Sequence, residues 1–268
     1  MDIRTKPLSR SPRTRWRRVA AVLLSAMLGG TVAAQGGPWP DARQLVLVVS
    51  ADWDAPRGRL HAYQRHAPDA AWQAVGGGAE VVLGRAGSAW GIGLHPRQSG
   101  GPHKREGDGR SPAGAFAIGA AFGYADADAV ASGLGYRAMT ATDWCVDVPG
   151  SPLYNRIVDS AAVGEAAVAG ATEPMRRDIH ADGDQRYRAG FVIDHNPDAS
   201  AGAGSCIFAH LWDSPDTPTA GCTAMAAPRM QTLLGWLERE AAPVFVLLPE
   251  SEYRRLREAW RLPAGAAP

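Results

Sequence analysis

Short apolar runs separated by glycine- and proline-rich turns constrain the fold of this chain most strongly. Residues 44–50 read QLVLVVS, a composition typical of a buried strand. Residues 59–65 alternate between polar and apolar side chains, as a half-exposed strand does. Residues 72–75 and 79–84 predict two more short strands on either side of a triple glycine. This spacing favours a mainly β, antiparallel layout over repeated strand–helix–strand units.

The second half of the chain continues the pattern. Residues 191–196 and 206–210 predict two strands that lie side by side, with residues 197–204 as the hairpin loop between them. Residues 225–240 fit a helix with one apolar face, and residues 243–248 form a last buried strand.

Domain organisation follows from what the sequence lacks. We find no internal repeat, low-complexity tract or linker that divides the chain. We therefore predict a single domain over residues 35–249. Residues 250–268 are predicted to be a C-terminal tail that can include a short helix.

The first 34 residues have the pattern of an export signal peptide. A basic region ending at Arg18 is followed by an apolar run over residues 19–28 and by residues 32–34 (VAA), which resemble a small-residue cleavage site. This run is shorter than the ~20 residues that span a bilayer, although an uncleaved membrane anchor is the alternative. We expect a periplasmic mature protein that is not an integral membrane protein once the signal is removed.

Charge argues against a nucleic-acid-binding role. The chain has 28 Lys and Arg and 27 Asp and Glu, but the first 34 residues hold seven of the basic residues and one of the acidic ones. The remainder therefore carries 21 basic and 26 acidic residues. Because proteins that bind nucleic acids usually present a basic surface, we expect no nucleic-acid partner.

Residues 204–222 carry the side chains of a nucleophilic site. An apolar segment ends in His210, and Cys222 follows a proline-containing loop at what the pattern indicates is a helix start. A thiol is a good nucleophile only as a thiolate, and a nearby imidazole or helix N-terminus lowers its pKa. We predict that Cys222 and His210 form a nucleophile and base pair, with the backbone N–H groups of Gly221 and Cys222 binding an oxyanion. A purely structural cysteine is the alternative.

A zinc site is the main rival interpretation. Zinc prefers Cys and His ligands. The candidate ligands in this chain are Cys206, His210 and Cys222, with His195 as a fourth. Only Cys206 and His210 show the close spacing typical of such sites, and on a strand they would stand far apart. We expect neither a metal nor another cofactor. A serine mechanism has no support, since the chain lacks a Gly-x-Ser-x-Gly motif.

Three cysteines in an exported protein indicate one disulfide and one free thiol. Spacing alone does not separate the three possible pairings. If Cys222 is the reactive thiol, Cys145 and Cys206 are the remaining pair. Two buried free thiols are the alternative, since cysteine is often a small core residue.

The motifs around these residues resemble the L,D-transpeptidase catalytic domain, also called the YkuD domain. Residues 204–210 (GSCIFAH) and 219–222 (TAGC) carry the resemblance to its nucleophile and base segments. Residues 104–116 are similar to the K-x-E-G-D-G-x-[ST]-P-x-G-x-F stretch of that family, and residues 192–196 to its neighbouring strand. The similarity extends over residues 44–249. By themselves, the charges of the 104–116 loop fit either a cleft rim that positions a polar ligand or a solvated loop.

The resemblance implies a mostly β fold, a YkuD-like β-sandwich or mixed sheets, with a short helix after Cys222. It also implies cysteine acyl transfer on peptidoglycan stem peptides. Cys222 would attack an amide, release a terminal D-Ala and form a thioester that a second stem's amine or water resolves. His210 would be the general base, and the Gly221 and Cys222 backbone would hold the oxyanion. Supporting contacts to substrate would come from three neighbours: Ser205, Thr219 and Ala220.

Two departures from the family pattern predict a divergent branch. Better-known members have His where this chain has Ala220, with Arg or Asn shortly after the nucleophile. They also have Gly after the base His, where this chain has Leu211. Crosslinking, trimming by an L,D-carboxypeptidase activity and hydrolysis therefore all stay open. A non-catalytic cell-wall binding protein on the same fold is the alternative from another class.

Overall fold

The computed structural model describes residues 1–3, 37–130 and 132–268. Apart from its first three residues, the predicted signal peptide lies outside the described residues. None of the described helices has the length and apolar character needed to cross a membrane.

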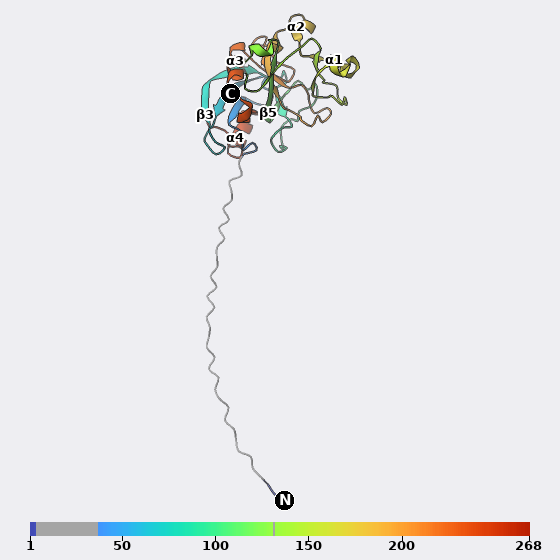
Figure 1. The fold of residues 1–268 in the computed structure, drawn as a ribbon. Helices are drawn as coiled ribbons and strands as arrows, with labels where there is room; N and C mark the ends of the chain where they lie inside the picture. The colour runs from blue at the N-terminus through green and yellow to red at the C-terminus, as the bar shows by residue number, and fades with distance from the viewer. Residues whose placement is uncertain (4–36, 131) are drawn as a thin grey trace. The chain divides into compact units, whose positions relative to one another are not determined.

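The described chain is mainly β (Figure 1). The strands are β1 (Gln44–Ser50), β2 (Arg57–Gln64), β3 (Gln73–Val82), β4 (Ser88–Trp90), β5 (Ser111–Gly123), β6 (Tyr136–Ala138), β7 (Asp143–Cys145), β8 (Ile157–Asp159), β9 (Glu173–Pro174), β10 (Ala189–Ile193), β11 (Phe208–Leu211), β12 (Thr223–Met225) and β13 (Val244–Pro249). The α-helices are α1 (Ser160–Val163), α2 (Arg177–His180), α3 (Ala227–Trp236) and α4 (Glu250–Leu256), and the 3-10 helices are η1 (Ala127–Ala129), η2 (Glu165–Val168), η3 (Arg186–Arg188) and η4 (Arg239–Ala241).

One sheet organises the described chain. Its strand order is β10-β11-β12-β3-β2-β1-β13-β5-β4, with β6 also paired to β5. Because β10 pairs with β5 as well as with β11, the sheet curls back on itself. The second sheet has the order β8-β7-β9 and belongs to the long segment between β5 and β10.

The sheet is mixed, so the predicted antiparallel layout is only partly right. The predicted hairpin of β10 and β11 is antiparallel, as is the pairing of β1 with β2. However, β1 pairs in parallel with β13, and β11 in parallel with β12. These pairings join segments that are not consecutive hairpins, and local turn patterns carry no information about them.

The triple glycine lies inside a strand rather than between two strands. β3 runs unbroken from Gln73 to Val82 where two short strands were predicted. Gly76 has φ +66°, and the register of β2 on β3 shifts between Leu60 and Ala62. The glycines therefore accommodate an irregular register without ending the strand.

The core lies around the two central strands. Every residue of β1 and of β13 is buried, as the apolar composition of both segments predicts. The C-terminal tail contributes to this core beyond the predicted short helix α4. Trp260 and Leu262 are 4% and 6% exposed, and the Trp260 ring packs edge-on against Trp39 at 5.3 Å.

The segment between β5 and β10 forms a second, smaller packing unit, which carries α1 and α2 (Figure 1). A separate cluster of buried side chains joins this segment to β11 and to the start of β12. The cluster consists of Phe122, Met139, Cys145, Met175, Tyr187, Cys206, Phe208 and Cys222. The predicted nucleophile therefore lies where this segment packs on the main sheet.

Candidate functional site

Two neighbouring strands carry the predicted nucleophile and base. β11 and β12 are parallel, and His210 is paired with Ala224. Two residues earlier on β11, the Phe208 N–H donates to Cys222 Sγ at 3.3 Å. Side chains two residues apart on a strand share a face, so Phe208 and His210 point the same way. Because Ala209 is paired with Thr223, Cys222 lies opposite Phe208 one residue earlier, and both side chains belong to one buried cluster. Cys222 and His210 therefore lie on one face, although no hydrogen bond joins their side chains in the described structure.

Cys222 lies immediately before a strand, and the prediction that it begins a helix is wrong. It is followed at once by β12, and α3 starts only at Ala227. The thiol therefore gains nothing from a helix N-terminus. It is buried, with 8% of the residue exposed. Burial raises the pKa of Cys222 to about 12, the charge of Glu173 adds to this rise, and hydrogen bonds from Phe208 and Tyr187 partly oppose it. The resting thiol is protonated.

His210 is held as a neutral ring in one tautomer. Its Nδ1 lies 2.7 Å from the Leu211 carbonyl oxygen, so Nδ1–H donates and Nε2 is left as the acceptor. Burial lowers the pKa of His210 to about 4, against the opposing effect of this backbone bond, and the charges of Arg186 and Arg177 lower it further. A neutral imidazole with a free acceptor nitrogen is the form that can take a proton from a thiol.

The turn before Cys222 is braced by hydroxyl groups. Thr219 Oγ1 donates to the Cys222 carbonyl at 2.6 Å and accepts the Gly221 N–H at 3.1 Å. Ser111 Oγ donates to the same carbonyl at 2.9 Å and accepts the Gly84 N–H. Thr219 is thus a structural brace at rest, and the Gly221 N–H must exchange this partner before it can bind an oxyanion.

Ser111 was missed as a site residue, although the sequence contained a usable signal. It occupies the [ST] position of the 104–116 stretch that resembles the family. Ala220, by contrast, is exposed beside the nucleophile.

Several charged side chains of the 104–116 loop are bonded to other groups of the protein. Lys104 and Asp108 form a 2.5 Å salt bridge with side chains 4% and 18% exposed. Glu106 accepts hydrogen bonds from the Tyr154 hydroxyl and, at 2.6 Å, from Ser205 Oγ. The loop therefore ties the segment before β11 to the body, and Ser205 is engaged in that bracing instead of being free for a ligand.

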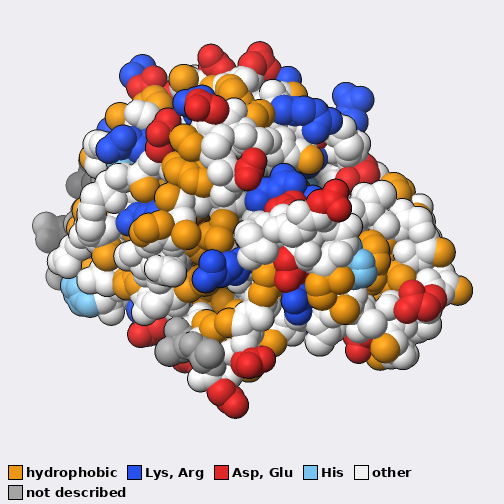
Figure 2. All heavy atoms as spheres, turned by 90° about the horizontal axis from the view of Figure 1, so that it is seen from above, with side chains coloured by type: hydrophobic (Ala, Val, Ile, Leu, Met, Phe, Trp, Pro, Cys, Tyr) orange, Lys and Arg blue, Asp and Glu red, His pale blue; other side chains and the backbone are white. Residues whose placement is uncertain are grey.

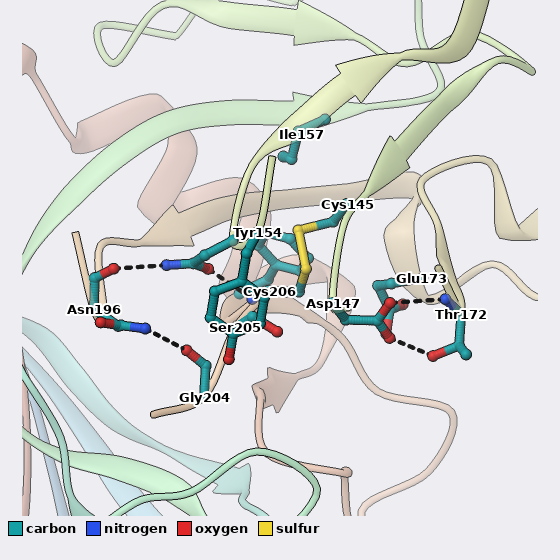
Figure 3. Close-up of a disulfide and its surroundings, with 12 residues drawn as sticks. Cys145, Asp147, Tyr154, Ile157, Thr172, Glu173, Asn196, Gly204, Ser205 and Cys206 are labelled. Atoms are coloured by element: carbon teal, nitrogen blue, oxygen red, sulfur yellow. Dashed lines mark hydrogen bonds between the residues drawn. A yellow bond between two sulfur atoms is a disulfide. The ribbon is translucent and has the colours of Figure 1, made fainter. Parts of the chain in front are cut away.

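A disulfide joins Cys145 to Cys206, the pair that remains when Cys222 is the free thiol. Figure 3 shows this bond beside a network of two amide side chains. Asn155 accepts the Cys206 N–H at 2.9 Å and donates to the Asn196 carbonyl, while Asn196 donates to the Gly204 carbonyl. Cys206 has φ +55°, and its carbonyl accepts a 3.5 Å bond from Cys222 Sγ. The disulfide and the amides thus fix the residue against which the nucleophile rests.

The four candidate zinc ligands do not converge. Cys206 is consumed by the disulfide, and His195 uses both ring nitrogens, with Nδ1 accepting the Ile92 N–H and Nε2 at 3.0 Å from the Ala203 carbonyl. Among the described residues, no group of three or more His, Cys, Asp or Glu side chains is placed to hold a metal.

Charged and aromatic residues from the segment between β5 and β10 complete the site. The Tyr187 ring lies 5.1 Å from the His210 ring and 5.5 Å from the Phe208 ring. Arg177 lies over Tyr187 at 5.4 Å and pairs with Glu173 at 3.1 Å. No sequence motif pointed to these contacts, because they depend on how the segment between β5 and β10 folds onto the main sheet.

A cavity of about 220 Å³ adjoins the site between the main sheet and this segment. Phe208 and Cys145 line it together with other mostly apolar side chains, and its polar members are Arg137, Asn155, Asp194 and His195. Phe208 therefore contacts both this cavity and the nucleophile.

Comparison of the chain with models of protein families, with curated proteins and with solved structures found no match in any of the three. The family resemblance therefore rests on the quoted motifs alone.

Proposed function

We propose that this protein is an exported cysteine acyltransferase of the L,D-transpeptidase type that acts on peptidoglycan stem peptides. The observation that carries the proposal is that Cys222, immediately before β12, lies on the same face as His210 of the parallel strand β11, with the His210 tautomer fixed by Leu211. The disulfide supports an oxidising compartment, in agreement with the predicted periplasmic location.

In the proposed reaction, the thiol proton moves to His210 Nε2 as Cys222 Sγ attacks the substrate carbonyl. The resulting imidazolium returns this proton to the departing amine of D-Ala, which leaves a thioester on Cys222. An amine of a second stem, or water, then attacks the thioester and restores the thiol. Because the resting thiol and imidazole are both neutral, proton transfer must accompany the attack instead of preceding it.

Burial of the nucleophile favours a second candidate function. Cys222 and His210 are 8% and 4% exposed, and the thiol is protonated at rest. A cell-wall binding protein that kept the fold but has no turnover would need neither substrate access to Cys222 nor an ionised thiol, so this burial fits it as well. Trimming with water as the acceptor is the alternative within the enzyme class.

Product analysis of muropeptides separates these candidates. The mature protein, starting at residue 35, is incubated with a mixture of tetrapeptide muropeptides, and the products are separated by chromatography. We expect crosslinked or D-Ala-trimmed products with the wild type and none with Cys222→Ala. Asp216→Asn, an exposed change in the loop between the two site residues, serves as the matched control and should keep full activity. Products that persist in Cys222→Ala would contradict the assignment of the nucleophile.

A further inference from the structure

The carbonyl oxygen of Cys222 accepts hydrogen bonds from two side chains. Thr219 Oγ1 donates to it at 2.6 Å and Ser111 Oγ at 2.9 Å. A carbonyl oxygen has two lone pairs, so these two hydroxyls use its full capacity. Each hydroxyl also accepts a backbone N–H, that of Gly221 at 3.1 Å for Thr219 and that of Gly84 at 2.9 Å for Ser111. Two hydroxyls from separate segments therefore meet at the carbonyl of the candidate nucleophile.

Rotation of its side chain is the simplest way for Thr219 to leave this arrangement. Its backbone N–H donates to the Leu83 carbonyl and its own carbonyl accepts the Arg85 N–H, each at 2.8 Å. The turn that follows is closely packed, since a Cβ atom on Gly221 would lie 3.1 Å from the Arg110 carbonyl oxygen. Rotation about the Thr219 Cα–Cβ bond breaks both bonds of Oγ1 and leaves the backbone in place. This small movement would free the Gly221 N–H for an oxyanion.

The Ser111 hydroxyl decides how unfavourable this rotation is. Once Thr219 has turned away, the Cys222 carbonyl keeps its bond from Ser111. Without the Ser111 hydroxyl, the same rotation would remove both side-chain donors from the carbonyl. Ser111 and Cys222 are 0% and 8% exposed, so water does not readily replace a lost donor there. A buried acceptor that loses its donors is unfavourable, and Ser111 prevents this state.

We propose that Ser111 is a positioning residue, which keeps the Cys222 carbonyl bonded while Thr219 turns away and the Gly221 N–H becomes available to the oxyanion. The inference rests on the proposed function for the oxyanion, and it adds the step that makes this donor available. A rigid brace is the contrasting arrangement, in which both hydroxyls hold the carbonyl and neither leaves it. The two arrangements predict opposite effects of removing the Ser111 hydroxyl.

Hydrogen exchange of the Gly221 amide, followed by NMR on the isotope-labelled mature protein, tests this without requiring turnover. The amide exchanges when it loses its Thr219 acceptor, so the rate follows the population of the rotated state. We expect Ser111→Ala to slow this exchange about tenfold, because rotation would then leave a buried carbonyl without a donor. In a rigid brace, loss of one hydroxyl loosens the turn and speeds the exchange. Thr219→Val removes the acceptor itself and should speed the exchange.

The rate at which Cys222 forms the thioester connects the same variants to catalysis. Mass spectrometry of the intact protein measures it over a range of tetrapeptide muropeptide concentrations. Ser111→Ala should slow the step about tenfold at saturating donor and leave the half-saturating concentration unchanged. In Thr219→Val, where no hydroxyl has to turn away, adding Ser111→Ala should have little effect. A rigid brace predicts the reverse, with the larger loss in the Thr219→Val background, because the carbonyl then has no side-chain donor.

Ser88→Ala is the matched control. Ser88 is also fully buried and is the register partner of Ser111 on the neighbouring strand β4, but its hydroxyl has no hydrogen-bond partner among the described residues. Both of its rates should equal those of the wild type.

Unchanged or faster Gly221 exchange in Ser111→Ala would overturn the inference, as would a larger loss of thioester formation in the Thr219→Val background. Unchanged exchange in Thr219→Val would also overturn it, whether or not Ser111→Ala folds. Slower exchange in Ser111→Ala, in a protein whose wild type forms no thioester, would uphold the role of Ser111 in releasing the Gly221 N–H and refute the proposed enzyme.

Discussion

Two buried histidines, His195 and His210, lie close to the candidate site, and burial lowers the pKa of each to about 4. An imidazole in the unfolded chain has a pKa near 6.5. As the pH falls below that value, the unfolded chain binds protons that the folded protein does not accept until about pH 4. The free energy of unfolding therefore falls as the pH drops from 6.5 to 4 and is unaffected by these groups above pH 7.

We predict that each histidine contributes about 3 kcal/mol to this loss, from a shift of roughly 2.5 pKa units. Urea unfolding at pH 7, 5.5 and 4.5 measures the effect. His210→Gln should lose less stability on acidification than the wild type. His66→Gln, which changes an exposed histidine, should behave like the wild type. A free energy of unfolding that does not change between pH 7 and 4.5 would contradict the neutral, buried state of both rings.

At the scale of elements, local patterns identified strands well and their partners poorly. β1 has the predicted bounds, and β13 and the β10–β11 hairpin agree with prediction to within a few residues. The parallel partners and the closure of β10 onto β5 depend on contacts between distant segments. Cys222 illustrates the same limit, because the helical pattern after it is real but a short buried strand, β12, intervenes.

Gly114 shows what the 104–116 stretch does structurally. It lies within β5 at φ +133°, and a Cβ atom there would approach His95 Cε1 to 2.1 Å. We predict that Gly114→Ala lowers the free energy of unfolding by about 3 kcal/mol or more, since both a clash and backbone strain result. Gly107→Ala is the matched control, because φ is +69° but nothing lies within 4 Å. It should cost only about 1 kcal/mol. Equal losses in urea unfolding would contradict the packing role of Gly114.

The disulfide connects the segment between β5 and β10 to the strand that presents His210. It joins residues 61 positions apart, and the chain-entropy model gives about 4 kcal/mol of stabilisation for a loop of that length. We predict that dithiothreitol lowers the free energy of unfolding of the wild type by about this amount. The double variant Cys145→Ala/Cys206→Ala should be equally unstable with and without reductant. A wild type that is insensitive to complete reduction would contradict this role of the bond.

At the scale of the whole molecule, some residues of the candidate site could be predicted from the sequence and others could not. The motifs predicted the pair Cys222 and His210. They did not identify Tyr187, Glu173 and Arg177, because those side chains reach the site only through the folding of the segment between β5 and β10. On the face shown in Figure 2, Lys and Arg side chains are interspersed with Asp and Glu and with apolar atoms, and no broad basic surface is seen there.

The central claim is that a stem peptide becomes covalently attached to Cys222. Mass spectrometry of the intact mature protein, followed by peptide mapping, measures this directly after brief incubation with a tetrapeptide muropeptide. We predict a mass increase equal to the donor minus D-Ala, located on the peptide that contains Cys222, lost on adding an acceptor amine and absent from Cys222→Ala. Turnover with the acyl group on a different residue, or with no acyl group on Cys222 under conditions that trap a thioester, would contradict the account.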